Sequence, residues 1–124
     1  MKTVLVFESY ERDYQLVLRG LMSLLSEDAN LICFHRIEEG MPWVDFASVI
    51  VLGTSFTDSP RIIINTLKGP RRKNPKARYI LFAAHNLKPA DLGVQAVVRK
   101  PSLEALARVI NRELALLPAQ GGTP

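Results

Sequence analysis

Runs of consecutive apolar residues alternate along this chain with segments in which apolar residues recur every three or four positions. Uninterrupted runs of this kind, rich in β-branched residues, are typical of strands buried on both faces of a parallel sheet. They predict five strands, at residues 3–7, 31–34, 48–52, 78–84 and 94–98. The third run stands at the centre of the chain, and its strand is expected to end at Gly53.

Two of the intervening segments predict long helices. Apolar residues at three- and four-residue steps over residues 10–25 indicate an amphipathic helix that Ser9 can cap. Ser59 and Pro60 open another helix as its cap and first residue, and Gly69–Pro70 is expected to end it. Both helices are long enough to cover a sheet.

The remaining helices differ in length. Gly40 and Pro42 leave room for little more than one turn before the third strand, so Trp43 is expected to cover the sheet there instead. A brief helix is expected from Pro89. Ser102 caps a final amphipathic helix whose apolar stripe extends to residue 117.

Alternating strands and helices with right-handed crossovers predict an α/β fold of three layers, with helices on both faces of one parallel sheet. The flavodoxin-like strand order 2-1-3-4-5 is the natural choice, and it places the ends of the first and third strands side by side. We expect one domain at residues 1–117, and a flexible tail or the start of a linker at 118–124.

The composition supports a globular protein. Hydrophobic residues make up 48% of the 124 residues and charged residues 23%, a balance that argues against disorder. The apolar runs are too short to cross a bilayer, so we expect a soluble, cytoplasmic protein without membrane contact. The single cysteine, Cys33, cannot form an internal disulfide and is expected to act as a small core residue.

The net charge of +4 is concentrated in one interval, which is expected to be a loop at the edge of the sheet opposite the strand ends. Two interpretations are open for it: a solvated loop, or a contact for phosphates or an acidic partner. Because no aromatic residue is interleaved in it, we do not expect it to bind nucleic acid. This basic patch comprises Lys68, Arg71, Arg72, Lys73, Lys76 and Arg78.

Lys100–Pro101, placed between the fifth strand and the final helix, gives nearly the whole chain a resemblance to the receiver domain of bacterial response regulators, the CheY-like family. In that family an acidic pair follows the first strand, a phosphoacceptor Asp the third, a Ser or Thr the fourth, and Lys-Pro the fifth. The carboxylates hold magnesium, and the hydroxyl and ammonium bind the phosphoryl oxygens.

Position by position, this chain keeps little of that set. The acidic pair corresponds to Glu8 and Ser9, the phosphoacceptor to Gly53, and the hydroxyl to Ala83 or Ala84, so Lys100 alone is fully retained. Glycine has no side chain to phosphorylate, and a single carboxylate is a poor magnesium ligand. The resemblance therefore implies an atypical pseudo-receiver, and we expect an ion pair between Glu8 and Lys100 in place of the site.

From this resemblance we expect a regulatory module that acts without phosphorylation, through a protein partner, a fused output domain such as that of a transcriptional regulator, or a homodimer. We expect no enzymatic activity, no cofactor and no bound metal. The fourth helix is short, which weakens the case for dimers through the family's usual face, formed by the fourth helix, fifth strand and fifth helix.

Two alternatives remain open at this stage. The loop after the third strand offers hydroxyl and backbone N–H groups that suit an anion or a phosphate-bearing ligand, with Thr54, Ser55, Thr57 and Ser59 as its candidate residues. His85, with Glu8 and Lys100, could form an acid–base group at the strand ends. His35 has no evident partner, and Asp58 is expected to cap the helix that begins near Pro60.

Overall fold

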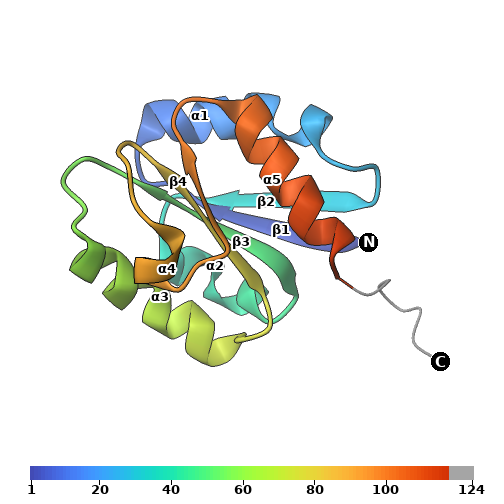
Figure 1. Ribbon diagram of the computed structural model, residues 1–124. Helices are drawn as coiled ribbons and strands as arrows, with labels where there is room; N and C mark the ends of the chain where they lie inside the picture. The colour runs from blue at the N-terminus through green and yellow to red at the C-terminus, as the bar shows by residue number, and fades with distance from the viewer. Residues whose placement is uncertain (118–124) are drawn as a thin grey trace.

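The apolar runs form a five-stranded parallel sheet in the computed structural model, which describes residues 1–117 (Figure 1). The strand order is β2-β1-β3-β4-β5, so the predicted 2-1-3-4-5 topology is confirmed. The strands are β1 (Lys2–Phe7), β2 (Ala29–Phe34), β3 (Ala47–Thr54), β4 (Arg78–Ala83) and β5 (Ala96–Arg99). The sequence segment expected to be a tail or linker, 118–124, lies outside the described residues.

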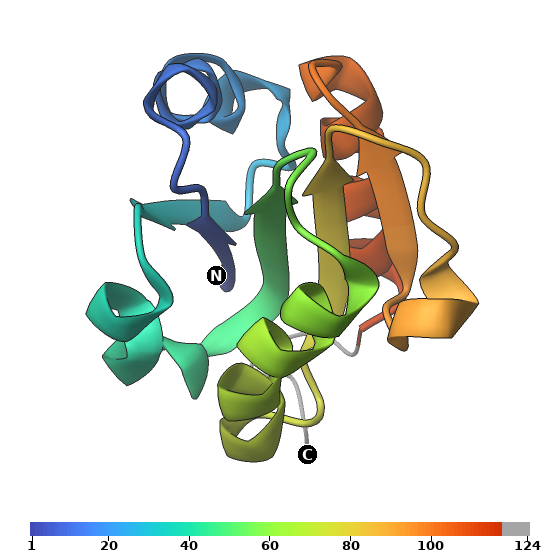
Figure 2. The same ribbon diagram turned by 90° about the vertical axis from the view of Figure 1, so that its left-hand side faces the viewer.

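Helices cover both faces of this sheet, as Figures 1 and 2 show. Alternate residues of each strand serve the two faces: Val4 and Val6 pack on one side, Leu5 and Phe7 on the other. The first side is covered by α1 (Glu11–Gly20) and α5 (Leu103–Ala115), and the second by α2 (Ile37–Val44), α3 (Pro60–Lys73) and the four-residue α4 (Pro89–Leu92). No helix within residues 1–117 has the length and apolar character that a membrane span requires.

Two of the three predicted serine caps are present. The hydroxyl of Ser59 accepts a hydrogen bond from the backbone N–H of Ile62, and that of Ser102 accepts one from Ala105. The prediction for Ser9 is wrong, because the N-cap of α1 is the next residue, Tyr10, and no side chain caps that end. The helix expected at 10–25 also ends early, at Gly20, and a 3-10 turn, η1 (Met22–Leu24), follows it.

The end of α3 differs from the prediction. The helix continues through Gly69–Pro70 to Lys73, so most of the basic patch is helical and does not lie in a loop. Pro70 lacks an N–H and is unfavourable inside a helix by about 3 kcal/mol, but its ring is buried here. The next residue after the helix, Asn74, anchors the turn by donating to the carbonyl oxygens of Val44 and Ala47.

The second helix also corrects an expectation. It has two turns, and its sheet-facing side is made by Gly40 and Val44, one turn apart. A Cβ atom on Gly40 would lie 2.4 Å from the ring of Phe7, so only glycine allows this close approach. Trp43 lies to one side of that contact and is 45% exposed, and it does not cover the sheet.

Candidate functional site

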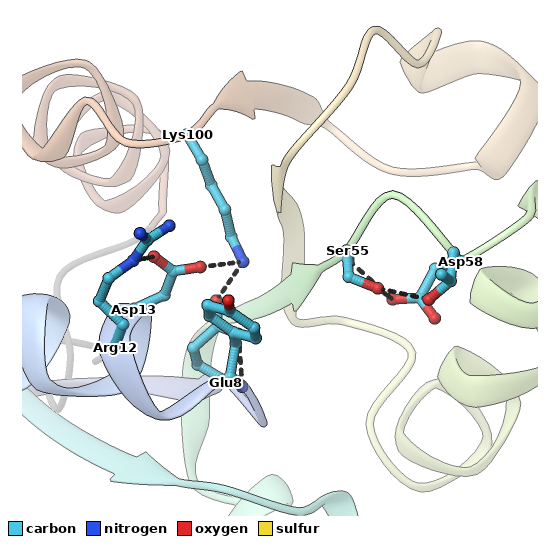
Figure 3. Close-up of polar contacts among 8 residues, drawn as sticks. Glu8, Arg12, Asp13, Ser55, Asp58 and Lys100 are labelled. Atoms are coloured by element: carbon cyan, nitrogen blue, oxygen red, sulfur yellow. Dashed lines mark hydrogen bonds and ion pairs between the residues drawn. The ribbon is translucent and has the colours of Figure 1, made fainter.

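Three charged side chains meet at the carboxyl end of the sheet. Lys100, which follows β5, donates a hydrogen bond from Nζ to Oδ2 of Asp13 at 2.9 Å and makes an ion pair with Oε1 of Glu8 at 2.8 Å. Glu8 follows β1, and Asp13 lies in the first turn of α1. Figure 3 shows the ammonium between the two carboxylates. All three side chains are at least nine-tenths buried, and the expected Glu8–Lys100 pair is present.

Burial dominates the electrostatics of Glu8. It raises the pKa of the Glu8 carboxyl above its ordinary value, and the hydrogen bond and positive charge of Lys100 oppose that rise. The backbone N–H of Tyr10 also donates to Oε2 of Glu8, at 3.1 Å. A buried carboxylate needs such partners, because an unpaired buried charge costs several kcal/mol.

Gly53 lies directly against this carboxylate. A Cβ atom built on Gly53 would be 1.9 Å from Oε1 of Glu8 and 2.4 Å from its Cδ, so no other residue fits without displacing Glu8. The phosphoacceptor position of the resemblance is therefore filled by the side chain of a neighbouring strand. Glycine at this position is explained by the close approach of Glu8.

Asp13 is the site residue that the sequence analysis did not identify. The signal was its spacing, because Asp13, Val17 and Leu21 follow one another at four-residue steps and all three are buried. An acidic residue on the apolar side of a helix requires a cation, and Lys100 supplies it. The guanidinium of Arg12 lies 4.0 Å from the other oxygen of Asp13 and adds a second positive charge at the rim.

The two carboxylates do not fit a magnesium ion. Magnesium requires oxygen ligands with room for several waters, whereas here the Lys100 ammonium already occupies the place between Glu8 and Asp13. Gly53 contributes no carboxylate, and the nearby Ser9 is exposed. Within residues 1–117, no group of three or more histidine, cysteine, aspartate or glutamate residues could hold a metal ion.

The other receiver-like positions surround Glu8, Asp13 and Lys100, which we call the ion triad. Ala83 is fully buried in β4 and offers no hydroxyl, and its carbonyl oxygen accepts from the backbone N–H of Lys100 at 2.8 Å. Beside the triad is an open hollow of about 290 Å³, into which Pro101 and the exposed rings of Tyr10 and Phe56 project. The hollow therefore has apolar side chains and Arg12 at its rim and the charges of Asp13 and Lys100 at its base.

The loop after β3 has its own internal anion. Oδ2 of Asp58 accepts hydrogen bonds from the backbone N–H of Ser55 at 2.8 Å and from its hydroxyl at 3.3 Å, as Figure 3 shows. The Ser55 hydroxyl also contacts that of Thr57, at 2.8 Å. Asp58 thus stabilises the loop, and the prediction that it caps α3 is wrong because Ser59 does so.

Thr54 and Ser59 are the other residues of the candidate anion-binding loop, and their hydroxyl groups have different surroundings. The Thr54 hydroxyl is buried without a hydrogen-bond partner among residues 1–117, whereas the Ser59 hydroxyl is used by the cap of α3. Several donors of this loop are thus already engaged by groups of the protein itself. Binding of an external anion there remains a prediction.

The two histidines differ from expectation. His85 Nδ1 is buried and has no hydrogen-bond partner within the described chain, and its ring stacks on Phe56 with centroids 6.2 Å apart. Its suggested partners, Glu8 and Lys100, contact each other instead. His35 was expected to have no partner, but its Nε2 lies 2.7 Å from Oε2 of Glu11 and its ring stacks on Tyr14.

Much of the basic patch has structural contacts. Arg71 donates to the carbonyl oxygens of Leu92 and Gly93, and Lys73 donates to that of Met41. Arg78 pairs with the buried carboxylate of Glu113 at 2.8 Å. These residues join elements of the fold, whereas Lys68, Arg72 and Lys76 are exposed.

No protein-family model and no curated protein matches the sequence. Solved structures do match. A pilus assembly-related protein from Burkholderia pseudomallei shares 17% identity over 93% of this chain and 90% of its own, with a TM-score of 0.73. A LuxR family DNA-binding response regulator from Silicibacter pomeroyi shares 11% over 97% and 99%, with a TM-score of 0.70.

A CheY-like receiver domain protein from Methanospirillum hungatei matches at 15% identity over 93% of this chain and 94% of its own, with a TM-score of 0.67. The fold is that of CheY-like receiver domains. At these identities the likeness concerns the backbone, so the chemistry of the site has to be argued from its own side chains.

Proposed function

We propose that this chain is a pseudo-receiver, a regulatory module of signal transduction that acts through protein contacts and without phosphorylation. The observation that carries the proposal is the Lys100 ammonium held between Glu8 and Asp13, in front of Gly53. The two charged groups that this chain retains at receiver positions, Glu8 and Lys100, are paired with each other.

The geometry argues against phosphotransfer at each step. A phosphoryl acceptor needs a nucleophilic side chain, and Gly53 has none. A phosphoryl group entering beside Glu8 would meet a carboxylate that lies 2.8 Å from the Lys100 ammonium, and would compete for that counter-ion. The hydroxyl that contacts a bound phosphoryl group in receivers is replaced by the methyl group of the buried Ala83.

A non-enzymatic role agrees with the same arrangement. His85 stacks on Phe56, and the carboxylate and ammonium that could assist it are paired with each other. His35, which follows β2, lies against Glu11 and stacks on Tyr14. General acid–base catalysis requires a group free to exchange protons with a substrate. The structural neighbours include a DNA-binding response regulator and a pilus assembly-related protein, which is in keeping with one fold being joined to different outputs.

Exposure to small phosphodonors tests the proposal. The chain is incubated with acetyl phosphate or beryllofluoride and magnesium, and its intact mass, its Trp43 fluorescence and its elution volume are compared with those of the untreated protein. All three are expected to stay unchanged. A phosphorylatable receiver domain treated in parallel shows that the reagents are active.

The matched variant is Gly53→Asp, which restores a carboxylate at the phosphoacceptor position. It too should remain unphosphorylated, because the second magnesium carboxylate and the hydroxyl are still missing and the new side chain displaces Glu8. A stoichiometric, hydroxylamine-sensitive acyl phosphate on the unmodified chain would refute the proposal.

A further inference from the structure

Exposed apolar side chains gather at the amino end of the sheet, the end opposite the ion triad. Phe46 is 67% exposed, and Met1, Trp43 and Leu116 are exposed as well. The N-terminus lies beside the end of α5 (Figure 1), where Nζ of Lys2 donates to the carbonyl oxygen of Leu114. Four large apolar side chains on one end of a small domain make a patch of the kind that marks contact surfaces.

The strand register fixes the order of residues across this end. Lys2 is paired with Ala29 on one side, and Thr3 with Ala47 on the other, so Lys2 lies level with Phe46 and Met1 lies between Asp28 and Asp45. Further across, Lys76 and Phe46 line one hollow of about 300 Å³. We call the surface formed by Glu27, Asp28, Met1, Trp43, Phe46, Arg72, Lys76 and Leu116 the amino-end face.

Charge is divided between the two sides of the amino-end face. Glu27 and Asp28 are exposed beside β2, whereas Arg72 and Lys76 are exposed beside β4. Asp45, which lies among the basic residues, is paired with Lys73 at 3.8 Å, and neither Arg72 nor Lys76 has an ion pair within residues 1–117. The face thus runs from acidic through apolar to basic.

We propose that the amino-end face joins two copies of this chain. A two-fold axis through its apolar centre would place the acidic side of each copy against the basic side of the other, which is the self-complementarity that a symmetric dimer requires. The centre supplies apolar surface to bury, and the hollow beside Phe46 has room for a side chain of the second copy.

The division of charge favours this occupant over others. A nucleic acid or an anionic membrane presents one sign of charge and would be repelled by Glu27 and Asp28. The contact does not depend on the phosphoacceptor position, which lies at the opposite end of the sheet. The proposed dimer and the proposed absence of phosphorylation can therefore be tested independently of each other.

Sedimentation velocity of the full chain tests the proposal over concentrations up to about 1 mM. A monomer–dimer equilibrium that weakens with added salt is expected. Trp43, the single tryptophan, reports on the same event, because its emission should shift to the blue as its ring is buried. A chain that stays monomeric throughout this range overturns the proposal.

Two matched phenylalanines locate the surface. Phe46→Ser should raise the dimer dissociation constant at least about tenfold, whereas Phe56→Ser, which changes an even more exposed ring at the opposite end, should leave it unchanged. Circular dichroism confirms that both variants are folded. Equal effects of the two variants, or no effect of Phe46→Ser, would assign the association to another surface.

Charge reversal supplies the sharpest outcome. Asp28→Lys and Lys76→Glu should each weaken self-association at least about tenfold at low ionic strength, because each cancels the charge of one side and places the substituted position opposite a like charge. An equimolar mixture of the two variants should associate again, since each substituted position then faces a charge of the opposite sign. If the mixture stays monomeric while each variant is folded, the proposed pairing is wrong.

Discussion

Replacing Lys100 by methionine tests the energetics of the ion triad. Methionine keeps the length of the side chain but removes the ammonium that lies 2.8 Å from the Glu8 carboxylate and 2.9 Å from that of Asp13. Removing one partner of a buried pair costs about 3–5 kcal/mol, because the remaining charge is uncompensated. That is a large part of the stability of a domain of this size, typically about 5–15 kcal/mol.

Urea unfolding followed by circular dichroism measures this loss. With a slope of about 2 kcal/mol per molar urea, the unfolding midpoint at pH 7 should fall by about 2 M. Lys68→Met is the control, because Lys68 is exposed on α3 and has no ion pair within residues 1–117. It should change the free energy of unfolding by less than about 0.5 kcal/mol.

The pH dependence of the stability loss in Lys100→Met is an independent test. The pKa of Glu8 is raised in the folded protein, mainly by burial, so protonation of Glu8 favours folding: this contribution is present below its unfolded value and is lost as the pH rises through the folded pKa. Without Lys100 that pKa should rise further. The stability difference between the variant and the unmodified chain should therefore narrow as the pH falls from 7 toward 5.

A double-mutant cycle with Glu8→Gln separates the pair from the rest of the site. The coupling energy between Glu8 and Lys100 should be about 1–3 kcal/mol. The charge balance described for this site is wrong if the free energy of unfolding of Lys100→Met lies within about 1 kcal/mol of that of the unmodified chain at pH 7 and this difference does not depend on pH.

Two further predictions follow from close contacts and burial. Gly53→Ala should lower the free energy of unfolding by about 1–3 kcal/mol, measured by urea unfolding, because its methyl group meets the Glu8 carboxylate; an unchanged stability would show that Glu8 moves aside at no cost. Burial raises the pKa of the Cys33 thiol to about 11, so little thiolate exists at pH 8 and alkylation by iodoacetamide should be much slower than for the urea-unfolded chain; equal rates would contradict the burial.

The strand order could be predicted from the sequence because apolar runs and loop lengths report directly on a parallel sheet. Serine before proline, as in Ser59–Pro60, likewise marked a helix start that the structure bears out. The end of α3 could not be predicted, because Gly69–Pro70 usually stops a helix. Here the burial of Pro70 and the hydrogen bonds of Asn74 with the second helix and third strand offset that tendency.

The candidate site was predictable only in part. The Glu8–Lys100 pair followed from the strand ends that carry these residues, since such ends meet at one edge of the sheet. The role of Asp13 was not predicted. The helical spacing places Asp13 on the buried side of α1, but the contact with Lys100 depends on the orientation of α1 over the sheet edge, which the period of one helix does not determine. Trp43 was misplaced for a similar reason, because α2 makes two turns despite Pro42 and directs Gly40 toward the sheet.

The counter-ion of the two carboxylates is a side chain of the protein itself. This affects how long the signalling state of such a module lasts. A bound cation exchanges with its pool, whereas an ammonium on Lys100 has a fixed local concentration that no chelator or dilution can alter. A phosphorylated switch also has a lifetime set by hydrolysis. The pseudo-receiver proposed above would carry no group that hydrolysis removes, so its response would last as long as the chain and its partner remain together.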